Sequence, residues 1–229
     1  MKSVTIKQVV TILCLLVWAA SNPAVADCFD KRKAGMDWSG CKKINKMLDE
    51  TDFTGSRFDN ANLAFSRLDE SNFKGASMVK VSMTRATARR SRFEDADLTK
   101  SAGYRAVFDE AIMKNTNLTK SEYFRASFRE AIISDTDWSK SELGRVNFSG
   151  AQFENVSFRF TNLSRVIFSE AKLKNVDFRG AYTYLTHFEN VDLRMVKNLS
   201  QLQVDLSCGD LDTRLPEGRW MPDTWPCVE

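Results

Sequence analysis

The sequence predicts an all-β solenoid with four walls, and three regularities support this fold class. From Phe53 to Leu193, every fifth residue is a large apolar side chain, with three exceptions. The exceptions are Ala88, Gly103 and Thr183. The residue two places before each of these centres is always Ala, Ser, Thr or Val. A period of five fits neither an α-helix nor a β-strand, but it is typical of a repeat that turns once per unit.

The third regularity is a charge pattern that repeats every 20 residues and gives the number of pentads in one coil. Two places after the centres, one column consists of Lys80, Lys100, Lys120 and Lys140. The next column consists of Arg85, Arg105, Arg125, Arg145 and Arg165. Four pentads therefore form one coil of 20 residues. The repeat region, residues 51–195, is accordingly expected to form about seven coils. With layers ~4.8 Å apart, the rod would be roughly 35 Å long.

The repeat resembles the pentapeptide-repeat family, whose pattern is a small residue, often Asp or Asn, and then Leu or Phe. The segments Ala61-Asn62-Leu63, Ala96-Asp97-Leu98 and Val176-Asp177-Phe178 match this pattern fully. The resemblance implies a right-handed quadrilateral β-helix. Near the C-terminus, Cys208-Gly209-Asp210 and Trp225-Pro226-Cys227 resemble the ending of exported bacterial members of the family.

Three small centres interrupt the column of large inward side chains. Ala88, Gly103 and Thr183 would each leave a gap in the stack. We expect a repacked or slightly pinched coil at Gly103, with Tyr104 leaning over it, and a ligand pocket there is the alternative.

Residues 1–26 are typical of a secretory signal peptide. Lys2 and Lys7 supply the positive charge, an apolar run extends from Val9 to Ala20, and Ala24-Val25-Ala26 fits the cleavage rule. The apolar run is short for a membrane span, so an uncleaved anchor is the less favoured alternative. The mature protein is therefore expected in the periplasm or outside the cell.

The segments beside the repeats are predicted to be caps, because an open end of a solenoid exposes its apolar core. Residues 27–50 are predicted to form the N-terminal cap, with a short helix over residues 41–48 that has Ile44, Met47 and Leu48 on one face. Residues 196–229 are predicted to form the C-terminal cap and tail. A short helix is expected over residues 200–206, and Gly209 is the residue that prevents it from continuing. Caps at both ends disfavour end-to-end association, so a monomer is expected.

Signal cleavage would leave four cysteines, and an even number in an exported chain predicts disulfides. The favoured pairs are sequential, Cys28 with Cys41 and Cys208 with Cys227, because the rod holds its two ends far apart. A zinc site is the alternative, but there is no CxxC spacing and the one histidine, His187, lies in the repeats.

The sequence does not contain a recognisable catalytic site, so we expect no enzyme, no metal and no cofactor. A single histidine makes histidine-based acid–base catalysis improbable and excludes a multi-histidine metal site. There is no GxSxG motif and no Gly-rich phosphate loop.

The two basic columns are the strongest functional signal. Like charges ~4.8 Å apart repel by ~0.9 kcal/mol even at the dielectric constant of water, so a bound anion would relieve the repulsion. Tyr104 beside Arg105 and Phe124 beside Arg125 would add stacking surfaces. The favoured interpretation is nonetheless that acidic residues one pentad further on neutralise the arginine column as salt-bridge ladders. Those residues are Glu110, Glu130 and Glu170.

Two functional hypotheses follow for an exported, non-enzymatic scaffold. The first is binding of a protein or a cell-envelope component through one wall, with a candidate contact surface of Tyr104, Phe124, Val107, Ile112 and Ile132. The second is binding of a polyanion, either an anionic glycan or lipid headgroups, through the basic columns.

Some cytoplasmic members of the resembled family protect topoisomerases by mimicking DNA with a strongly acidic surface. That role is disfavoured here, because removing Lys2 and Lys7 lowers the formal charge only from +3 to +1. No nucleic acid partner is expected.

Overall fold

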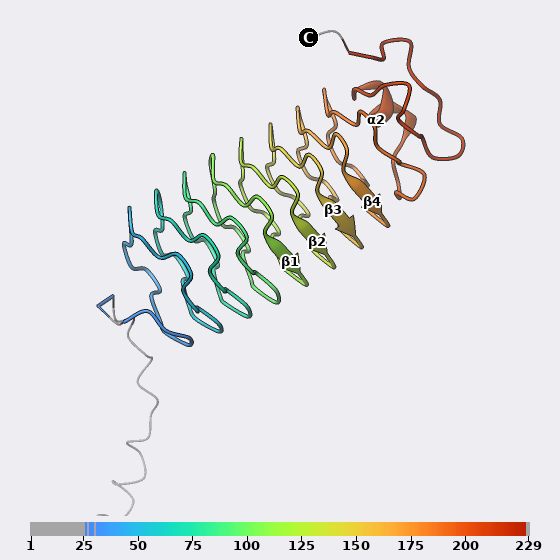
Figure 1. The fold of residues 1–229 in the computed structure, drawn as a ribbon. Coiled ribbons are helices and arrows are strands. Elements are labelled where there is room, and N and C mark those ends of the chain that lie inside the picture. The colour runs from blue at the N-terminus through green and yellow to red at the C-terminus, as the bar shows by residue number, and fades with distance from the viewer. Residues whose placement is uncertain (1–25, 27, 30, 228–229) are drawn as a thin grey trace, which may run out of the picture.

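The structure is a computed structural model that describes residues 26, 28, 29 and 31–227. The backbone winds into a four-walled β-helix whose coils stack along one axis (Figure 1). Parallel bridges join residues 20 positions apart, and from Asp37 to Lys197 one such column makes eight steps. The right-handed quadrilateral β-helix is confirmed, with about one coil more than expected.

Four columns of bridges define the four walls. Wall 1 follows Asp37 and every 20th residue after it, wall 2 follows Lys42, wall 3 follows Met47 and wall 4 follows Asp52. On wall 4 the bridges lengthen into a parallel sheet in the order β1-β2-β3-β4. Its strands are β1 (Ile112–Lys114), β2 (Ile132–Ser134), β3 (Gln152–Glu154) and β4 (Lys172–Lys174).

Each pentad points two side chains inward and turns at the corner that follows. The centres, such as Phe58 and Leu63, are fully buried, and so are the small residues two places earlier, such as Ala61. The residue two places after a centre has a positive φ, for example 54° at Arg105, which turns the chain onto the next wall. The columns predicted from residue spacing are therefore corner positions of the rod.

The core is held by stacking between coils and by hydrogen bonds from the small inward residues. The ring centroid of Phe128 lies 4.7 Å from that of Phe108 and 5.3 Å from that of Phe148. The hydroxyls of Thr116 and Thr161 each donate a 2.8 Å hydrogen bond to a carbonyl oxygen of the preceding coil. These buried hydroxyls are thus satisfied, as buried polar groups need to be.

The gap at Gly103 is filled from the next coil and not by its neighbour in sequence. A Cβ atom at Gly103 would lie 2.4 Å from two carbon atoms of the Tyr123 ring, so the ring occupies that space. The Tyr123 hydroxyl lies 2.7 Å from Ser101 Oγ, and burial raises the pKa of this tyrosine. Tyr104 does not fill the gap as expected: this side chain is 38% exposed and stacks with the ring of Phe124.

The predicted N-terminal helix is wrong, because residues 36–50 already follow the coil geometry. Lys42 and Met47 form parallel bridges with Asn62 and Arg67. Leu48 is a buried centre, whereas Ile44 and Met47 are 42% and 62% exposed. Ile44, Met47 and Leu48 are spaced as on one face of a helix, but only Leu48 is a centre of the five-residue repeat. The solenoid therefore begins before residue 51, and Trp38 is a buried centre of its first described coil.

The C-terminal cap contains the predicted helix, α2 (Gln201–Asp205), which begins with a capping box at Ser200. The side-chain amide of Gln203 donates to the carbonyl oxygens of Phe178 and Ala181, at 2.7 and 2.9 Å. The Thr183 hydroxyl donates to the Gln203 carbonyl oxygen at 2.8 Å. The small centre at Thr183 therefore provides an attachment point for the cap.

Both predicted disulfides are confirmed. Cys28 pairs with Cys41 and Cys208 pairs with Cys227, each with a Cα–Cα distance of 5.5 Å. The predicted signal peptide falls on residues 1–26, of which only Ala26 lies within the described residues. In the described part of the chain, no helix has the length and apolar character of a membrane span.

The substitution Gly103→Ala should destabilise the protein by roughly 1–3 kcal/mol, because the added methyl group would overlap the Tyr123 ring. The change is measured as a shift in the midpoint of urea unfolding.

Adding Tyr123→Leu should recover much of this loss, since Leu63 and Leu143 are centres on the same wall. Tyr123→Leu alone is the control, because it leaves a gap beside Gly103. Effects of the two substitutions that simply add would contradict the packing described here.

Replacing Cys208 and Cys227 together by serine should destabilise the cap by up to ~3 kcal/mol, because the disulfide closes a loop with a sequence separation of 19. Since coils contact only their neighbours, hydrogen exchange should rise over the cap and the last coil and not in the middle of the rod. The corresponding serine pair at Cys28 and Cys41 should act at the opposite end. A uniform rise along the rod would refute this local effect.

Candidate functional site

The two basic columns border the same wall of the rod, which we call the basic wall. It consists of wall 2 between residues 80 and 165, with the lysine column at one corner and the arginine column at the other. The columns stack in register: Arg105 N donates to the Phe124 carbonyl oxygen at 3.1 Å, and Arg125 N donates to that of Gly144 at 3.0 Å. All nine basic side chains are exposed. The predicted stacking along the rod is therefore confirmed.

The predicted salt-bridge ladders between the arginine column and the glutamates are wrong. Within the described residues, none of the nine basic side chains has an acidic oxygen within 4.0 Å. Glu110 lies across wall 3 from Arg105, on the order of 10 Å away for three extended residues. Glu110 instead belongs to the corner column of Glu70 and Arg90, and pairs form along that column. An Arg90 guanidinium nitrogen lies 2.5 Å from a carboxylate oxygen of Glu70 and 3.9 Å from one of Glu110.

The middle of the basic wall carries two carboxylates, those of Glu122 and Glu142. One of them is engaged with a neighbour, since Asn162 Nδ2 donates to Glu142 Oε2 at 2.8 Å. Nine cations at the borders and two carboxylates between them give this surface an excess of positive charge.

Aromatic side chains lie beside the arginine column. The rings of Tyr104 and Phe124 are parallel, with centroids 6.2 Å apart. Arg105 and Arg125 lie 5.2 and 5.6 Å from these two ring centroids, within range of a cation–π interaction. Phe124 also leans over Gly144, where a Cβ atom would approach its ring to 2.8 Å.

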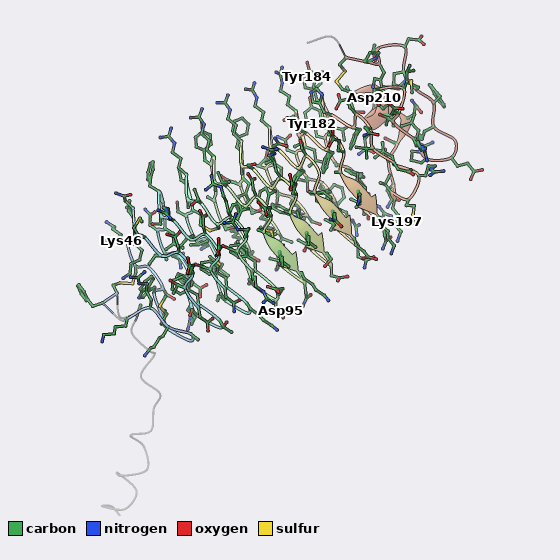
Figure 2. The ribbon with its side chains drawn as sticks, viewed as in Figure 1. Lys46, Asp95, Tyr182, Tyr184, Lys197 and Asp210 are labelled. Atoms are coloured by element: carbon green, nitrogen blue, oxygen red, sulfur yellow. A yellow bond between two sulfur atoms is a disulfide. The ribbon has the colours of Figure 1, made fainter. Side chains whose placement is uncertain are left out.

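A second aromatic pair lies at the C-terminal end of wall 2. Tyr182 and Tyr184 stack with centroids 6.2 Å apart, on a different wall from the strands of the sheet (Figure 2). Sequence analysis did not single out this pair, although both residues continue columns of wall 2 at 20-residue spacing.

The candidate protein-contact surface is not one surface. Tyr104 and Phe124 lie at the arginine corner, and Val107 lies in the middle of wall 3. Ile112 and Ile132 are paired in β1 and β2 on wall 4. The structure therefore distributes these residues over separate walls, where Tyr104 stacks with Phe124 and Ile112 pairs with Ile132.

Sequence analysis also missed a crevice at the C-terminal end of the arginine column. Its volume is about 580 Å³. It is lined by Arg145, Arg165, Ile167, Leu185, His187, Cys208 and Cys227. The corner column changes from arginine to Leu185 at this point, and that change is the signal in the sequence that could have drawn attention to it.

The single histidine forms a hydrogen-bonded pair with an acidic residue beside this crevice. His187 Nδ1 lies 2.7 Å from Glu189 Oε1. Burial on its own would raise the pKa of Glu189, but hydrogen bonds with His187 and Ser169 outweigh it and lower the pKa. Among the described residues, no group of three or more His, Cys, Asp or Glu side chains could hold a metal ion.

Stacked five-residue units with an inward centre define a repeat protein of the β-solenoid class. The chain belongs to the pentapeptide-repeat family. The family model for pentapeptide repeats matches residues 47–75, 66–102, 124–159 and 147–182, which together cover just over half of the chain. No curated protein matches the sequence.

Solved structures with a similar fold come from the same family. HetL, a pentapeptide repeat protein involved in heterocyst differentiation regulation in Nostoc sp. strain PCC 7120, is 16% identical, with a TM-score of 0.47 over 96% of this chain and 98% of HetL. QnrB1, a plasmid-mediated fluoroquinolone resistance protein, is 17% identical, with a TM-score of 0.44 over 79% of this chain and 86% of QnrB1. At these values neither likeness carries an argument about function.

The substitution Arg105→Asn should raise stability by up to about 1 kcal/mol. Arg105 has a φ of 54°, which Asn adopts more readily, and its charge is repelled by Arg85 and Arg125. The change is measured by thermal unfolding at low salt, and the gain should shrink at high salt because the repulsion is screened.

The matched control is Arg90→Asn, since Arg90 also has a φ of 54° but pairs with Glu70 and Glu110. This exchange makes the same change at the backbone while losing the ion pairs, so it should stabilise the protein less. Equal effects of the two substitutions at low salt would argue against an unneutralised arginine column.

Proposed function

We propose that this chain is an exported, non-catalytic scaffold that binds polyanions of the cell envelope through the basic wall. The observation that carries the proposal is the set of nine exposed cations on the borders of one wall, with no ion pair to any described acidic group. A linear array of like charges lowers its free energy when an anionic chain lies along it.

The geometry of the wall favours an extended ligand. The charges repeat at each coil, ~4.8 Å apart, so a glycan with repeated acidic groups could contact several coils at once. Tyr104 and Phe124 offer apolar ring surface beside the arginine column. Anionic lipid headgroups in a bilayer would present a similar array of charges.

Two observations support an extracytoplasmic location and a non-catalytic role. A disulfide closes each end of the chain, and disulfides persist in oxidising compartments. The expected signal peptide over residues 1–26 agrees with that location. Pentapeptide-repeat proteins are in general non-catalytic, and the inward positions of the described coils are filled by buried side chains.

Protection of a topoisomerase through an acidic, DNA-like surface has no support in this chain. Its lysine and arginine columns place nine cations beside one wall, and its formal net charge is +3 over the full sequence. A protein partner with an acidic face remains compatible with the basic wall and is tested as one outcome below.

The test is retention of residues 27–229 on immobilised heparin and on vesicles containing phosphatidylglycerol, eluted with a salt gradient. Replacing four lysines of the basic wall by glutamine should lower the salt concentration of elution markedly, because fewer charges are screened. The four lysines are Lys80, Lys100, Lys120 and Lys140.

The matched control replaces four exposed lysines at wall 4 by glutamine and should change elution little. These are Lys74, Lys114, Lys172 and Lys174. Heparin retention without vesicle binding would identify a glycan as the ligand, and the reverse result would identify a lipid surface. Negligible retention on both, or equal losses for the two variants, would overturn polyanion binding and leave a protein partner as the remaining hypothesis.

A further inference from the structure

The side chains that line the crevice at the end of the arginine column come from successive coils, so they follow one another along the rod. On its corner side, Arg145, Arg165 and Leu185 follow one another at successive coils. Arg145 N donates to the Ser164 carbonyl oxygen at 2.9 Å, and Leu185 N donates to that of Leu206 at 2.7 Å. The crevice therefore runs parallel to the rod axis, from the arginines toward the C-terminal cap.

On the wall 3 side, the lining runs in the same direction. Ile167 forms a parallel bridge with His187, and His187 forms one with Cys208. Cys208 is fully buried and carries the disulfide to Cys227, which lines the crevice at the cap. The end near the cap is therefore made of Leu185 and the disulfide.

The opposite end is cationic and available. Arg145 and Arg165 are stacked one layer apart, ~4.8 Å, and neither has an acidic group of the described chain within 4.0 Å. The carboxylate of Glu189, which is paired with His187 of the lining, has one oxygen 2.7 Å from His187 Nδ1 and the other 2.8 Å from Ser169 Oγ. Two guanidinium groups at this spacing can donate to the oxygens of one carboxylate or phosphate.

We propose that this crevice binds a single-chain amphiphile with an anionic head group. The carboxylate or phosphate lies between Arg145 and Arg165, and the apolar chain lies along Ile167 and Leu185 toward the disulfide. A volume of about 580 Å³ is within the range of small-molecule sites in proteins. This site is separate from the proposed function, because it needs two arginines and an apolar lining and does not need the full columns.

The test is isothermal titration calorimetry of residues 27–229 with monomeric dodecanoate and with dodecyl phosphate, in separate titrations that distinguish the two head groups. We expect one site per chain for at least one of them. Dodecyltrimethylammonium, which has the same chain and a cationic head, should not bind.

Two variants examine the two ends of the site. Replacing Arg145 and Arg165 together by glutamine should weaken binding by about tenfold or more, because the charge-assisted hydrogen bonds are lost. Leu185→Asn should weaken binding by roughly tenfold through loss of apolar contact. Asn is well suited to the φ of 51° at this position, so the fold should be retained, and the thermal midpoint checks it.

The matched control replaces Arg85 and Arg105 by glutamine. These two arginines belong to the same column but lie outside the crevice. This pair should weaken heparin retention and leave binding of the amphiphile unchanged, so the two proposals can fail separately. The amphiphile site is overturned by equal binding of the cationic amphiphile, by several equivalent sites per chain, by no binding of either anion, or by an equal loss in the control pair.

Discussion

The inward side chains of successive coils stack on one another, and the ring of Phe148 packs 5.3 Å from those of both Phe128 and Phe168. Each layer must therefore be filled by a bulky centre and a small partner, because the neighbouring coils leave no room for more. At Gly103 the missing side chain is supplied by Tyr123 from the next coil, and at Thr183 the hydroxyl holds the cap helix. The rod persists through these exceptions because each layer is completed by its neighbours.

The corners follow from the same packing and determine where charge can be placed. Each pentad ends in a residue with positive φ, a conformation that most side chains adopt at some energetic cost. Glycine occupies some corners, as at Gly55 and Gly75, but the basic wall has lysine and arginine there. These residues combine a left-handed backbone with repulsion along the column. Such a combination does not stabilise the rod, and it is compatible with the binding surface proposed above.

Much of the fold and part of the site could be predicted from the sequence. The buried centres, the 20-residue coil, the stacked basic columns, the C-terminal helix and both disulfides were all accessible from spacing and residue type. The predicted N-terminal helix was wrong, because Ile44, Met47 and Leu48 have a helical spacing, but only Leu48 occupies a centre of the five-residue register and is buried. The salt-bridge ladders were wrong because sequence neighbours one pentad apart are separated by the full width of a wall.

The sequence by itself determined the coil, because the alternation of large and small inward residues is local and keeps its register from Phe53 to Leu193 despite three small centres. The tertiary structure decided the lateral relationships. It placed Arg90, and not Arg105, within 4.0 Å of Glu110, and it divided Val107, Ile112 and Ile132 between two walls. It also formed the crevice between Arg165, Leu185 and Cys227. These distances depend on the width of a wall and on the path of the C-terminal cap over the last coil. A five-residue period predicts neither of them.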